Sequence, residues 1–361
     1  MQIGIVGLSY SGKTTFFQTL TETMLSPDAL QKRDANQAVV KVKDKRLDIL
    51  TAMFNPKKQV FATIEIVDLA GLQKGESSGK SFTSDFLNKV KTNDALIHVV
   101  RGFRDENVPH PDGSVDMIRD IRTLEEEFLF ADMAFIESRL EKIEKDIKRP
   151  KSKEQAEKEK KVMEKWNLQI QNEMPLRYLE MDIDELYFAK NYQALSAKPL
   201  LIALNLDEED INDAEKILND IKKQITGKRI AIEPFFAKIE MELVQLDDDE
   251  KQIFMEEYGI DESALERLVR AAYELLGLQS FFTVGEDECR AWTIKKGMTA
   301  QEAAGVIHTD FYNKFIRAEV VAYNDFLEHK TFAKCKEAGC FRLEGKDYIV
   351  KDGDILHVRH G

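Results

Sequence analysis

The sequence predicts an α/β fold with a doubly wound, mostly parallel sheet, followed by a smaller α+β module. Candidate strands alternate with helical segments through the first 277 of the 361 residues, which is the pattern of parallel sheets. Residues 2–6 form a short apolar strand, and the run G-L-S-Y-S-G-K-T at residues 7–14 leads from it into a helix. Ligands of such sheets bind beyond the carboxyl ends of the strands, so we expect the functional residues there.

Composition excludes several classes of protein. The net charge of -13 argues against a broad electrostatic grip on nucleic acid, so we expect no DNA partner and only local contact with RNA. Three cysteines without metal-ligand spacing favour a reducing compartment. No apolar run approaches the roughly 18 residues of a membrane span, and the first strand leaves no room for a signal peptide. We therefore expect a cytoplasmic protein with no membrane contact.

The run at residues 7–14 fits G-x-x-x-x-G-K-S/T, the phosphate-binding loop. Its glycines let successive backbone N–H groups turn inward around a phosphate chain, and the helix N-terminus adds a favourable dipole. Lys13 adds positive charge, and Thr14 would place its hydroxyl on Mg²⁺. The phosphate contacts are therefore assigned to six consecutive residues, Tyr10, Ser11, Gly12, Lys13, Thr14 and Thr15. The alternative is a glycine-rich turn with no ligand.

A second motif, D-L-A-G at residues 68–71, follows the strand predicted at residues 60–67. Alone, an Asp and a Gly after a strand are common turn residues. After a phosphate loop they match the D-x-x-G motif of nucleotide switches. In that motif Asp68 would hold Mg²⁺ through water, and the Gly71 N–H would sense the γ-phosphate.

From residue 117 the sequence changes to a heptad-like helical pattern that continues to residue 147. A charged turn that contains Pro150 separates it from a second helical stretch that reaches residue 179. The pair predicts a projecting coiled-coil hairpin, residues 118–190, inserted in the nucleotide-binding domain. Its mixed charge is typical of a solvated face, and contact of the lysine-rich tip, residues 148–161, with RNA is the alternative.

The other expected elements complete two domains. Strands are predicted at residues 38–42, 95–100, 199–204 and 229–236, and helices at 249–258 and 263–276. After residue 278 we predict a strand at 290–294, a helix at 299–311, and a hairpin at 345–359 that turns at residues 351–354. The sequence therefore predicts a nucleotide-binding domain over residues 1–277 and a small α+β domain over residues 278–361.

Together these motifs resemble the YchF-type, or Obg-like, ATPase family of translation factors. The resemblance covers nearly the whole chain and rests on residues 7–14, D-L-A-G-L at 68–72, N-L-D-E at 205–208, A-K-I-E at 237–240, R-A-W-T-I at 290–294 and E-G-K-D-Y-I-V at 344–350. It implies a P-loop G domain with an inserted coiled coil and a C-terminal ubiquitin-like (β-grasp) TGS domain. It also implies association with the ribosome, through the large subunit or ribosomal RNA, by the TGS and coiled-coil surfaces.

The N-L-D-E run bears on the choice of base. Typical GTPases use N-K-x-D, whose Lys stacks on guanine and whose Asp accepts from guanine N1–H and the 2-amino group. Here Leu206 removes the Lys and Glu208 replaces the Asp, which weakens discrimination against adenine. The resemblance implies that ATP is favoured and that Asn205, Leu206 and Glu208 border the base. Ala237 and Lys238 would add backbone and stacking contacts. A Glu208 that still reaches guanine would leave GTP as the substrate.

Hydrolysis needs a group that positions water, and Ras-like enzymes use a Gln directly after D-x-x-G. Leu72 stands at that place, so we expect slow intrinsic turnover. The resemblance implies that a loop histidine acts instead, and the matching residue is His110. From the residues alone, the alternative is that His110 is an exposed loop residue. We assign catalysis to His110 together with Lys13.

Two departures distinguish the chain from the family pattern. Aligning on Asn36 puts K-R-D at residues 32–34 where the switch I run T-I-E-P-N carries its Thr, so the second hydroxyl ligand of Mg²⁺ is missing. Tyr10 and Ser11 stand where the loop of the family usually has Asn-Val. We therefore do not expect the potassium-assisted catalysis that depends on that Asn.

The sequence therefore predicts a Mg²⁺-dependent ATPase switch whose nucleotide state rearranges residues 68–84 and is relayed to the ribosome. Two alternatives stay open. One is a nucleotide-gated binding module with negligible hydrolysis, and the other is a GTP-specific GTPase of the same fold. A kinase of small substrates fits poorly, because kinases lack the Asn205 motif and the C-terminal module.

Overall fold

The computed structural model describes residues 1–21, 36–69, 82–149, 153–257 and 262–361. The chain divides into two compact units. The first unit comprises Met1–Ala38 and Glu65–Leu268, and the second comprises Val39–Ile64 and Val269–Gly361. Among the described residues, no helix has both the length and the apolar character that crossing a membrane requires.

The first sheet has six strands, in the order β2-β4-β1-β5-β6-β7. Their bounds are β1 Gln2–Val6, β2 Asn36–Val42, β4 Ala62–Asp68, β5 Ala95–Arg101, β6 Leu200–Asn205 and β7 Ile230–Phe235. β1 runs parallel to both of its neighbours, β4 and β5, and the parallel pairing continues through β6 to β7. The strand order therefore reverses at β1, which confirms the doubly wound, parallel sheet and places a ligand crevice at the end of that strand.

Helices follow these strands, as the alternating sequence pattern predicted. They are α1 Lys13–Leu20, α4 Ser84–Lys91, α8 Ala214–Gln224, α9 Ala237–Gln245, α10 Asp248–Glu257 and α11 Ala264–Leu275, with a 3₁₀ turn, η2, at Glu208–Asp213. β5 and β6 are buried along their whole lengths, which explains their continuous apolar sequences. The ring of Phe16 in α1 packs edge-on against Phe235 of β7, with centroids 5.1 Å apart. The core thus fixes α1, the helix that begins at the phosphate loop.

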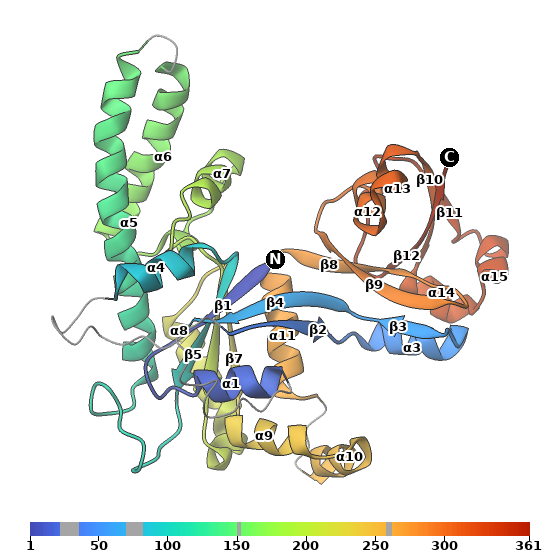
Figure 1. Ribbon diagram of the computed structural model, residues 1–361, viewed down its shortest axis with the longest axis horizontal. Helices are drawn as coiled ribbons and strands as arrows, with labels where there is room; N and C mark the ends of the chain where they lie inside the picture. Colours follow the sequence, from blue (N-terminus) through green and yellow to red (C-terminus); the bar gives the residue numbers. More distant parts are fainter. Residues whose placement is uncertain (22–35, 70–81, 150–152, 258–261) are drawn as a thin grey trace. The chain divides into compact units, whose positions relative to one another are not determined.

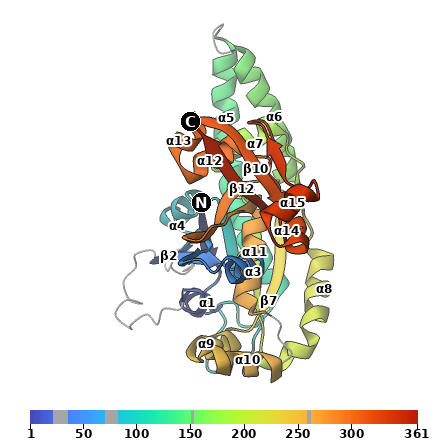
Figure 2. The same cartoon turned by 90° about the vertical axis from the view of Figure 1, so that its right-hand side faces the viewer.

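Two long helices, α5 Met117–Ile147 and α6 Lys153–Gln171, form the predicted hairpin and extend together away from the sheet (Figures 1 and 2). Their seam buries Ile136, Ile143, Ala156, Met163, Trp166 and Ile170. The hairpin itself ends at Gln171, before the predicted residue 190. A 3₁₀ turn, η1 Leu176–Tyr178, and a short helix, α7 Ile183–Asn191, follow it.

Buried polar contacts hold the root of the hairpin. Arg177 Nη1 donates to Glu125 Oε1 of α5 at 2.7 Å, and the same guanidinium donates to the carbonyls of Leu195 and Lys198. Asp132 of α5 accepts from two backbone N–H groups, at 2.9 and 2.7 Å, in the segment that precedes β6. The hairpin is therefore tied to the sheet by hydrogen bonds as well as by its apolar seam.

The second unit contains a six-stranded sheet, in the order β11-β10-β12-β8-β9-β3. Its elements are α3 Lys45–Phe54, β3 Lys58–Val60, β8 Leu278–Thr283, β9 Glu288–Lys295, α12 Ala300–Ile307, α13 Thr309–Asn313, β10 Phe315–Ala322, α14 Tyr323–His329, α15 Phe332–Glu337, β11 Arg342–Glu344 and β12 Asp354–His360. α12 packs on this sheet, and their shared core contains Phe281, Ile294, Ala303, Ala318, Val320 and Leu356. Figure 2 shows β10 and β12 side by side, as their antiparallel register requires.

Several predicted boundaries are wrong. The strand predicted at residues 60–67 is two strands, because β3 pairs with β9 in the second sheet whereas β4 joins the first. The helix predicted at 299–311 breaks at His308, whose ring accepts from Asp310 N–H and begins α13. The hairpin predicted at 345–359 does not form, since β12 pairs with β10 and β8. Residues 39–64 lie in the second unit, which the predicted domains 1–277 and 278–361 did not include.

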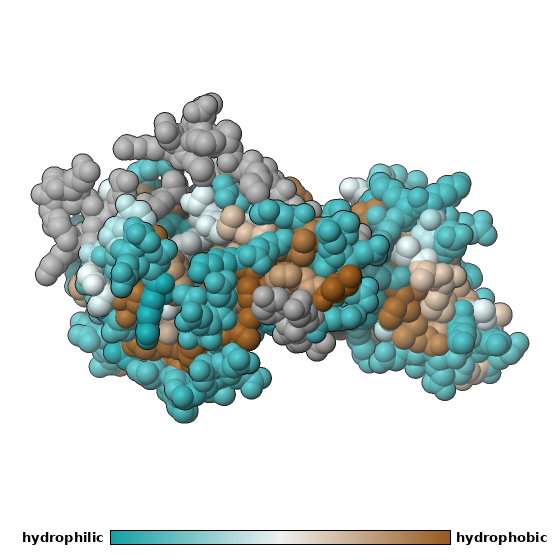
Figure 3. Space-filling model, turned by 90° about the horizontal axis from the view of Figure 1, so that it is seen from below, coloured by the Kyte–Doolittle hydropathy of each residue, from teal (hydrophilic) through white to brown (hydrophobic). Residues whose placement is uncertain are grey.

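Hydrophilic residues cover most of the described surface on the face shown in Figure 3, and hydrophobic residues form smaller patches between them. This surface agrees with the share of charged residues, 32% of the chain.

Candidate functional site

The loop after β1 requires its glycines. Gly7 and Gly12 have φ angles of 152° and 95°, in the region that favours glycine. A Cβ on Gly7 would lie 2.4 Å from Val99 O, and one on Gly12 would lie 2.3 Å from Asn205 Nδ2. Tyr10 is also left-handed, with φ 61°, and its side chain is exposed. The backbone between β1 and α1 is thus held in the tight turn that the motif predicted.

Lys13 lies inside this turn rather than in solvent. Its side chain is buried, and its Nζ donates to Leu8 O at 2.7 Å. Burial lowers the pKa of Lys13 to about 8, and the nearby Asp68 carboxylate partly opposes that shift. A phosphate anion close to this ammonium would restore its usual preference for the charged form.

Asp68, at the end of β4, lies beside the loop because it pairs with Ile5 of β1. Burial raises the pKa of the Asp68 carboxyl, and the Lys13 ammonium lowers it in part. Among the described residues, Asp68 Oδ1 is a buried oxygen without a hydrogen-bond partner. Thr14, at the start of α1, is exposed. A carboxylate oxygen and a hydroxyl are hard donors that suit Mg²⁺, so the side chains present fit the predicted metal.

Asn205 joins the phosphate loop to the elements predicted to border the base. Its side-chain Nδ2 donates to Ser11 O at 3.1 Å, and its Oδ1 accepts from Ala237 N–H at 3.2 Å. The side chain is buried at the end of β6, and α9 begins at Ala237. The structure thus brings together three of the regions that the sequence predicted.

Leu206 and Glu208 differ in position. Leu206 is only 3% exposed, and a Cβ on Gly102 would lie 2.6 Å from its Cδ2. The Leu206 side chain packs into the core, and its place beside the base stays a prediction. Glu208 is half exposed, and its Oε1 accepts from Lys238 Nζ at 3.3 Å. That contact raises the pKa of Lys238.

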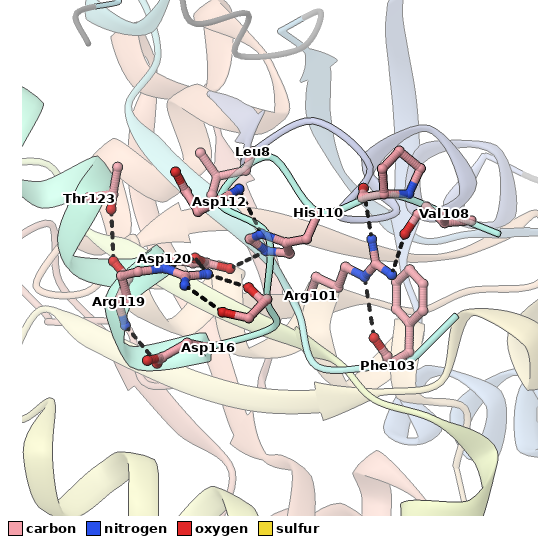
Figure 4. Close-up of polar contacts among 12 residues, drawn as sticks. Leu8, Arg101, Phe103, Val108, His110, Asp112, Asp116, Arg119, Asp120 and Thr123 are labelled. Atoms are coloured by element: carbon pink, nitrogen blue, oxygen red, sulfur yellow. Dashed lines mark hydrogen bonds and ion pairs between the residues drawn. The ribbon is translucent and has the colours of Figure 1, made fainter. Parts of the chain in front are cut away.

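His110 is held by hydrogen bonds on both sides of its ring (Figure 4). Its Nδ1 accepts from Asp112 N–H at 3.1 Å, so Nε2 carries the proton and donates to Asp120 Oδ2 at 2.9 Å. The His110 and Asp120 side chains are 5% and 3% exposed. Arg119 contacts the other oxygen of Asp120 at 2.9 Å. The alternative of an exposed loop histidine is therefore wrong, because the ring is buried in a hydrogen-bonded cluster.

Sequence reasoning missed Arg101, which organises the loop that carries His110. The buried guanidinium donates to four loop carbonyls, those of Phe103, Asp105, Val108 and Pro109. The guanidinium also lies 4.5 Å from the centroid of the Phe103 ring. Figure 4 shows the two side chains next to each other. Burial lowers the pKa of Arg101. The available signal was a charged residue at the end of the otherwise apolar run that forms β5.

The remaining candidates are a histidine within β5 and residues that the structure does not describe. His98 is buried within β5, and burial lowers its pKa to about 3. Gly71, Leu72 and residues 32–34 lie outside the described residues. Their assigned roles in γ-phosphate sensing, water positioning and the first switch are therefore predictions only.

Comparisons with known proteins agree with this arrangement. A family model described as "50S ribosome-binding GTPase" matches residues 2–129. A second model, for the C-terminal region of YchF GTPases and described as "Protein of unknown function", matches residues 278–361. Together the two matches cover the phosphate loop, β4 and the C-terminal strands.

Relatives match over nearly the full length. "Ribosome-binding ATPase YchF" of Bacillus subtilis is 42% identical over 360 residues, covering 99% of this chain and 98% of the relative. "Obg-like ATPase 1" of Caenorhabditis elegans is 37% identical over 364 residues, covering 99% and 92%. The solved structure of the Schizosaccharomyces pombe YchF GTPase superposes with a TM-score of 0.87 at 32% identity, covering 99% and 97%. The predicted resemblance is confirmed, and the chain belongs to the YchF family of P-loop GTPase-fold proteins.

Proposed function

We propose that this protein is a Mg²⁺-dependent ATPase switch that acts with the ribosome in the cytoplasm. The observation that carries the proposal is the pair of hydrogen bonds from Asn205 to Ser11 and Ala237. One buried amide connects the phosphate loop with the start of α9. A nucleotide can therefore place its phosphates against residues 10–15 and its base near Asn205 within one crevice.

The triphosphate is bound by the N–H groups of residues 10–15 and by the Lys13 ammonium. Mg²⁺ would be held by the Thr14 hydroxyl and, through water, by Asp68, whose Oδ1 has no partner among the described residues. When bound, the ion neutralises charge on the phosphate oxygens. Gly71 N–H senses the γ-phosphate in this proposal.

ATP is favoured over GTP because the carboxylate that would read guanine is engaged elsewhere. Glu208 contacts Lys238 at 3.3 Å, and Asp207 lies 3.9 Å from the same ammonium. Binding guanine through Glu208 would require breaking this contact, whereas adenine has no 2-amino group to satisfy. Asn205 and Ala237 remain beside the base in either case.

Turnover is slow until the partner binds. His110 orients the attacking water and Lys13 stabilises the phosphate charge in the transition state. In the present structure both nitrogens of His110 are occupied, so its ring must leave Asp120 before it can act on water. The relatives are named ribosome-binding ATPases, and one matched model is described as binding the 50S subunit. We therefore assign the trigger to the large subunit or its RNA, contacted by the hairpin and the C-terminal TGS domain.

Isothermal titration with ATP, ADP, GTP and GDP tests the choice of base. Tighter binding of ATP than of GTP is expected, and equal or tighter binding of GTP would reject the ATP assignment and support the GTPase alternative.

Single-turnover hydrolysis, with and without ribosomes, tests the enzyme. Ribosomes should raise the rate well above that of Lys13→Ala, and His110→Ala should lose the stimulation while keeping its ATP affinity. A parent rate no higher than that of Lys13→Ala would favour a nucleotide-gated binding module with negligible hydrolysis.

A further inference from the structure

Two cysteines occupy special positions at the end of α15. The helix ends at Glu337, and Gly339 follows in the left-handed conformation with φ 74°. Gly339 N–H donates to Lys336 O at 3.1 Å, and Cys340 N–H donates to Cys335 O at 3.0 Å. This pair of bonds defines a Schellman motif, in which the residue after the glycine packs on the third residue from the helix end. Those two residues are Cys340 and Cys335.

The two cysteines are in contact, as that motif requires. Cys340 Sγ donates to Cys335 O at 3.4 Å, and Cys335 Sγ lies 4.0 Å from Asp325 O, on the side of α14. Cys335 is fully buried and Cys340 is partly exposed. Disulfides need α-carbons and β-carbons at close range, which a single turn closed by a backbone hydrogen bond provides. Cys289, the third cysteine, is buried in β9, outside this turn.

We propose that Cys335 and Cys340 form a dithiol site that a small-molecule disulfide oxidises to an intramolecular disulfide. The site lies in the second unit and is independent of the nucleotide function proposed above. Cys340 is the entry point because it is the thiol that solvent reaches. Cys335 attacks the intermediate because both the backbone N–H and the thiol of Cys340 already bond to the Cys335 carbonyl, which holds the two residues together.

The exchange balances in two steps. The Cys340 thiolate attacks one sulfur of the reagent, the reagent's S–S bond breaks, and its other half leaves as a thiolate while Cys340 forms a mixed disulfide. Cys335 then loses its proton and attacks the Cys340 sulfur, which releases the second thiolate. The protein loses two electrons and two protons, and the reagent gains them as two thiols. Burial and the neighbouring thiol raise the pKa of Cys335 to about 11, so the second step is slow at neutral pH.

The disulfide would fix the junction between α15 and β11. Phe341 N–H also donates to Cys335 O at 3.2 Å, and Lys336 Nζ lies 4.5 Å from the Phe341 ring centroid. Lys336 and Phe341 line a cavity of ≈ 560 Å³ in the second unit. Oxidation therefore immobilises one wall of that cavity without adding a group to it.

The test uses the full-length protein treated with oxidised glutathione at pH 7.0 and pH 8.5. Denaturing mass spectrometry should show a loss of about 2 Da, and one reactive thiol should remain of three. The reaction should be several-fold faster at pH 8.5. Amide hydrogen exchange at Cys340 and Phe341 should slow after oxidation and recover after reduction.

Variants separate the two thiols. Cys335→Ala should stop at the mixed disulfide and gain the mass of one glutathione, whereas Cys340→Ser should not react at the site. Cys289→Ser is the matched control and should oxidise as the parent does. Three results in the parent protein would overturn the proposal. They are glutathione that stays bound to the protein, a disulfide between two chains, and oxidation of the Cys289 thiol in place of the Cys335 and Cys340 thiols.

Discussion

Asn205 Nδ2 lies 3.1 Å from Ser11 O, although the two residues are 194 positions apart in the chain. The same side chain accepts from Ala237 N–H, so it connects β6, the phosphate loop and α9. Because the amide is buried, each of its partners would lack a hydrogen bond if it were removed. The phosphate loop is therefore held in place by a distant side chain as well as by its own backbone.

Replacing Asn205 with Ala should weaken ATP and ADP binding alike by about tenfold, or ~1.4 kcal/mol, because the loop loses its support. Isothermal titration measures both affinities. Asn191→Ala, which removes an exposed amide from α7, is the control and should bind as the parent does. Unchanged affinity in Asn205→Ala would show that the loop keeps its shape without this link.

Replacing Gly12 with Ala should abolish measurable ATP binding, because the new Cβ would lie 2.3 Å from Asn205 Nδ2. Gly297→Ala is a matched control, since Gly297 also has a positive φ, 88°, but nothing within 4 Å of the added atom. In both variants the free energy of unfolding should fall by about 1 kcal/mol, because Ala disfavours a positive φ. Only Gly12→Ala should lose ATP binding. An equal loss of ATP affinity in both variants would contradict the role of the close contact with Asn205.

ATP binding should take up a proton at pH 8.5 and much less at pH 6.5. In the free protein burial lowers the pKa of Lys13 to about 8, so the side chain is mostly neutral at pH 8.5. Nearby phosphate favours the ammonium and raises that pKa again, so binding draws a proton from buffer. Titration calorimetry in buffers of different ionisation enthalpy measures the uptake.

A second buried lysine provides the control for this measurement. Burial also lowers the pKa of Lys198 to about 8, but Lys198 donates to the carbonyls of Lys91 and Asn93, away from the loop. The uptake should therefore persist in Lys198→Met. Binding heats that do not depend on the buffer at pH 8.5 would count against a phosphate contact by Lys13.

Replacing Arg177 with Met should lower the free energy of unfolding by about 3–5 kcal/mol, because it leaves the Glu125 carboxylate buried without its cation. Burial raises the pKa of Glu125 and lowers that of Arg177, so both ions are costly to bury. The double variant Arg177→Met/Glu125→Leu should therefore recover part of the loss, because it removes the unpaired carboxylate but still leaves the carbonyls of Leu195 and Lys198 without their donor. Urea denaturation measures the free energy of unfolding of the parent, the single variant and the double variant. A double variant as unstable as Arg177→Met would refute this account.

The local elements followed from the sequence. The strand, loop and helix at residues 2–20 formed as predicted because glycine conformations and apolar runs act over a few neighbouring residues. The heptad pattern likewise predicted α5 and α6, since the two helices bury a seam that repeats along the chain. The predicted hairpin at 345–359 failed because two nearby strand-like segments do not reveal that β12 pairs with β10 and β8.

The sequence by itself determined that a phosphate loop exists, which family the chain resembles, and which residues stand at the ends of its strands. Only the tertiary structure decided that Asn205 supports Ser11, that Leu206 is buried beneath Gly102, and that Asp120 holds His110. A motif is encoded by adjacent residues whose backbone conformations are local. A hydrogen bond or a buried side chain depends instead on how distant segments pack, and no single stretch of sequence carries that information.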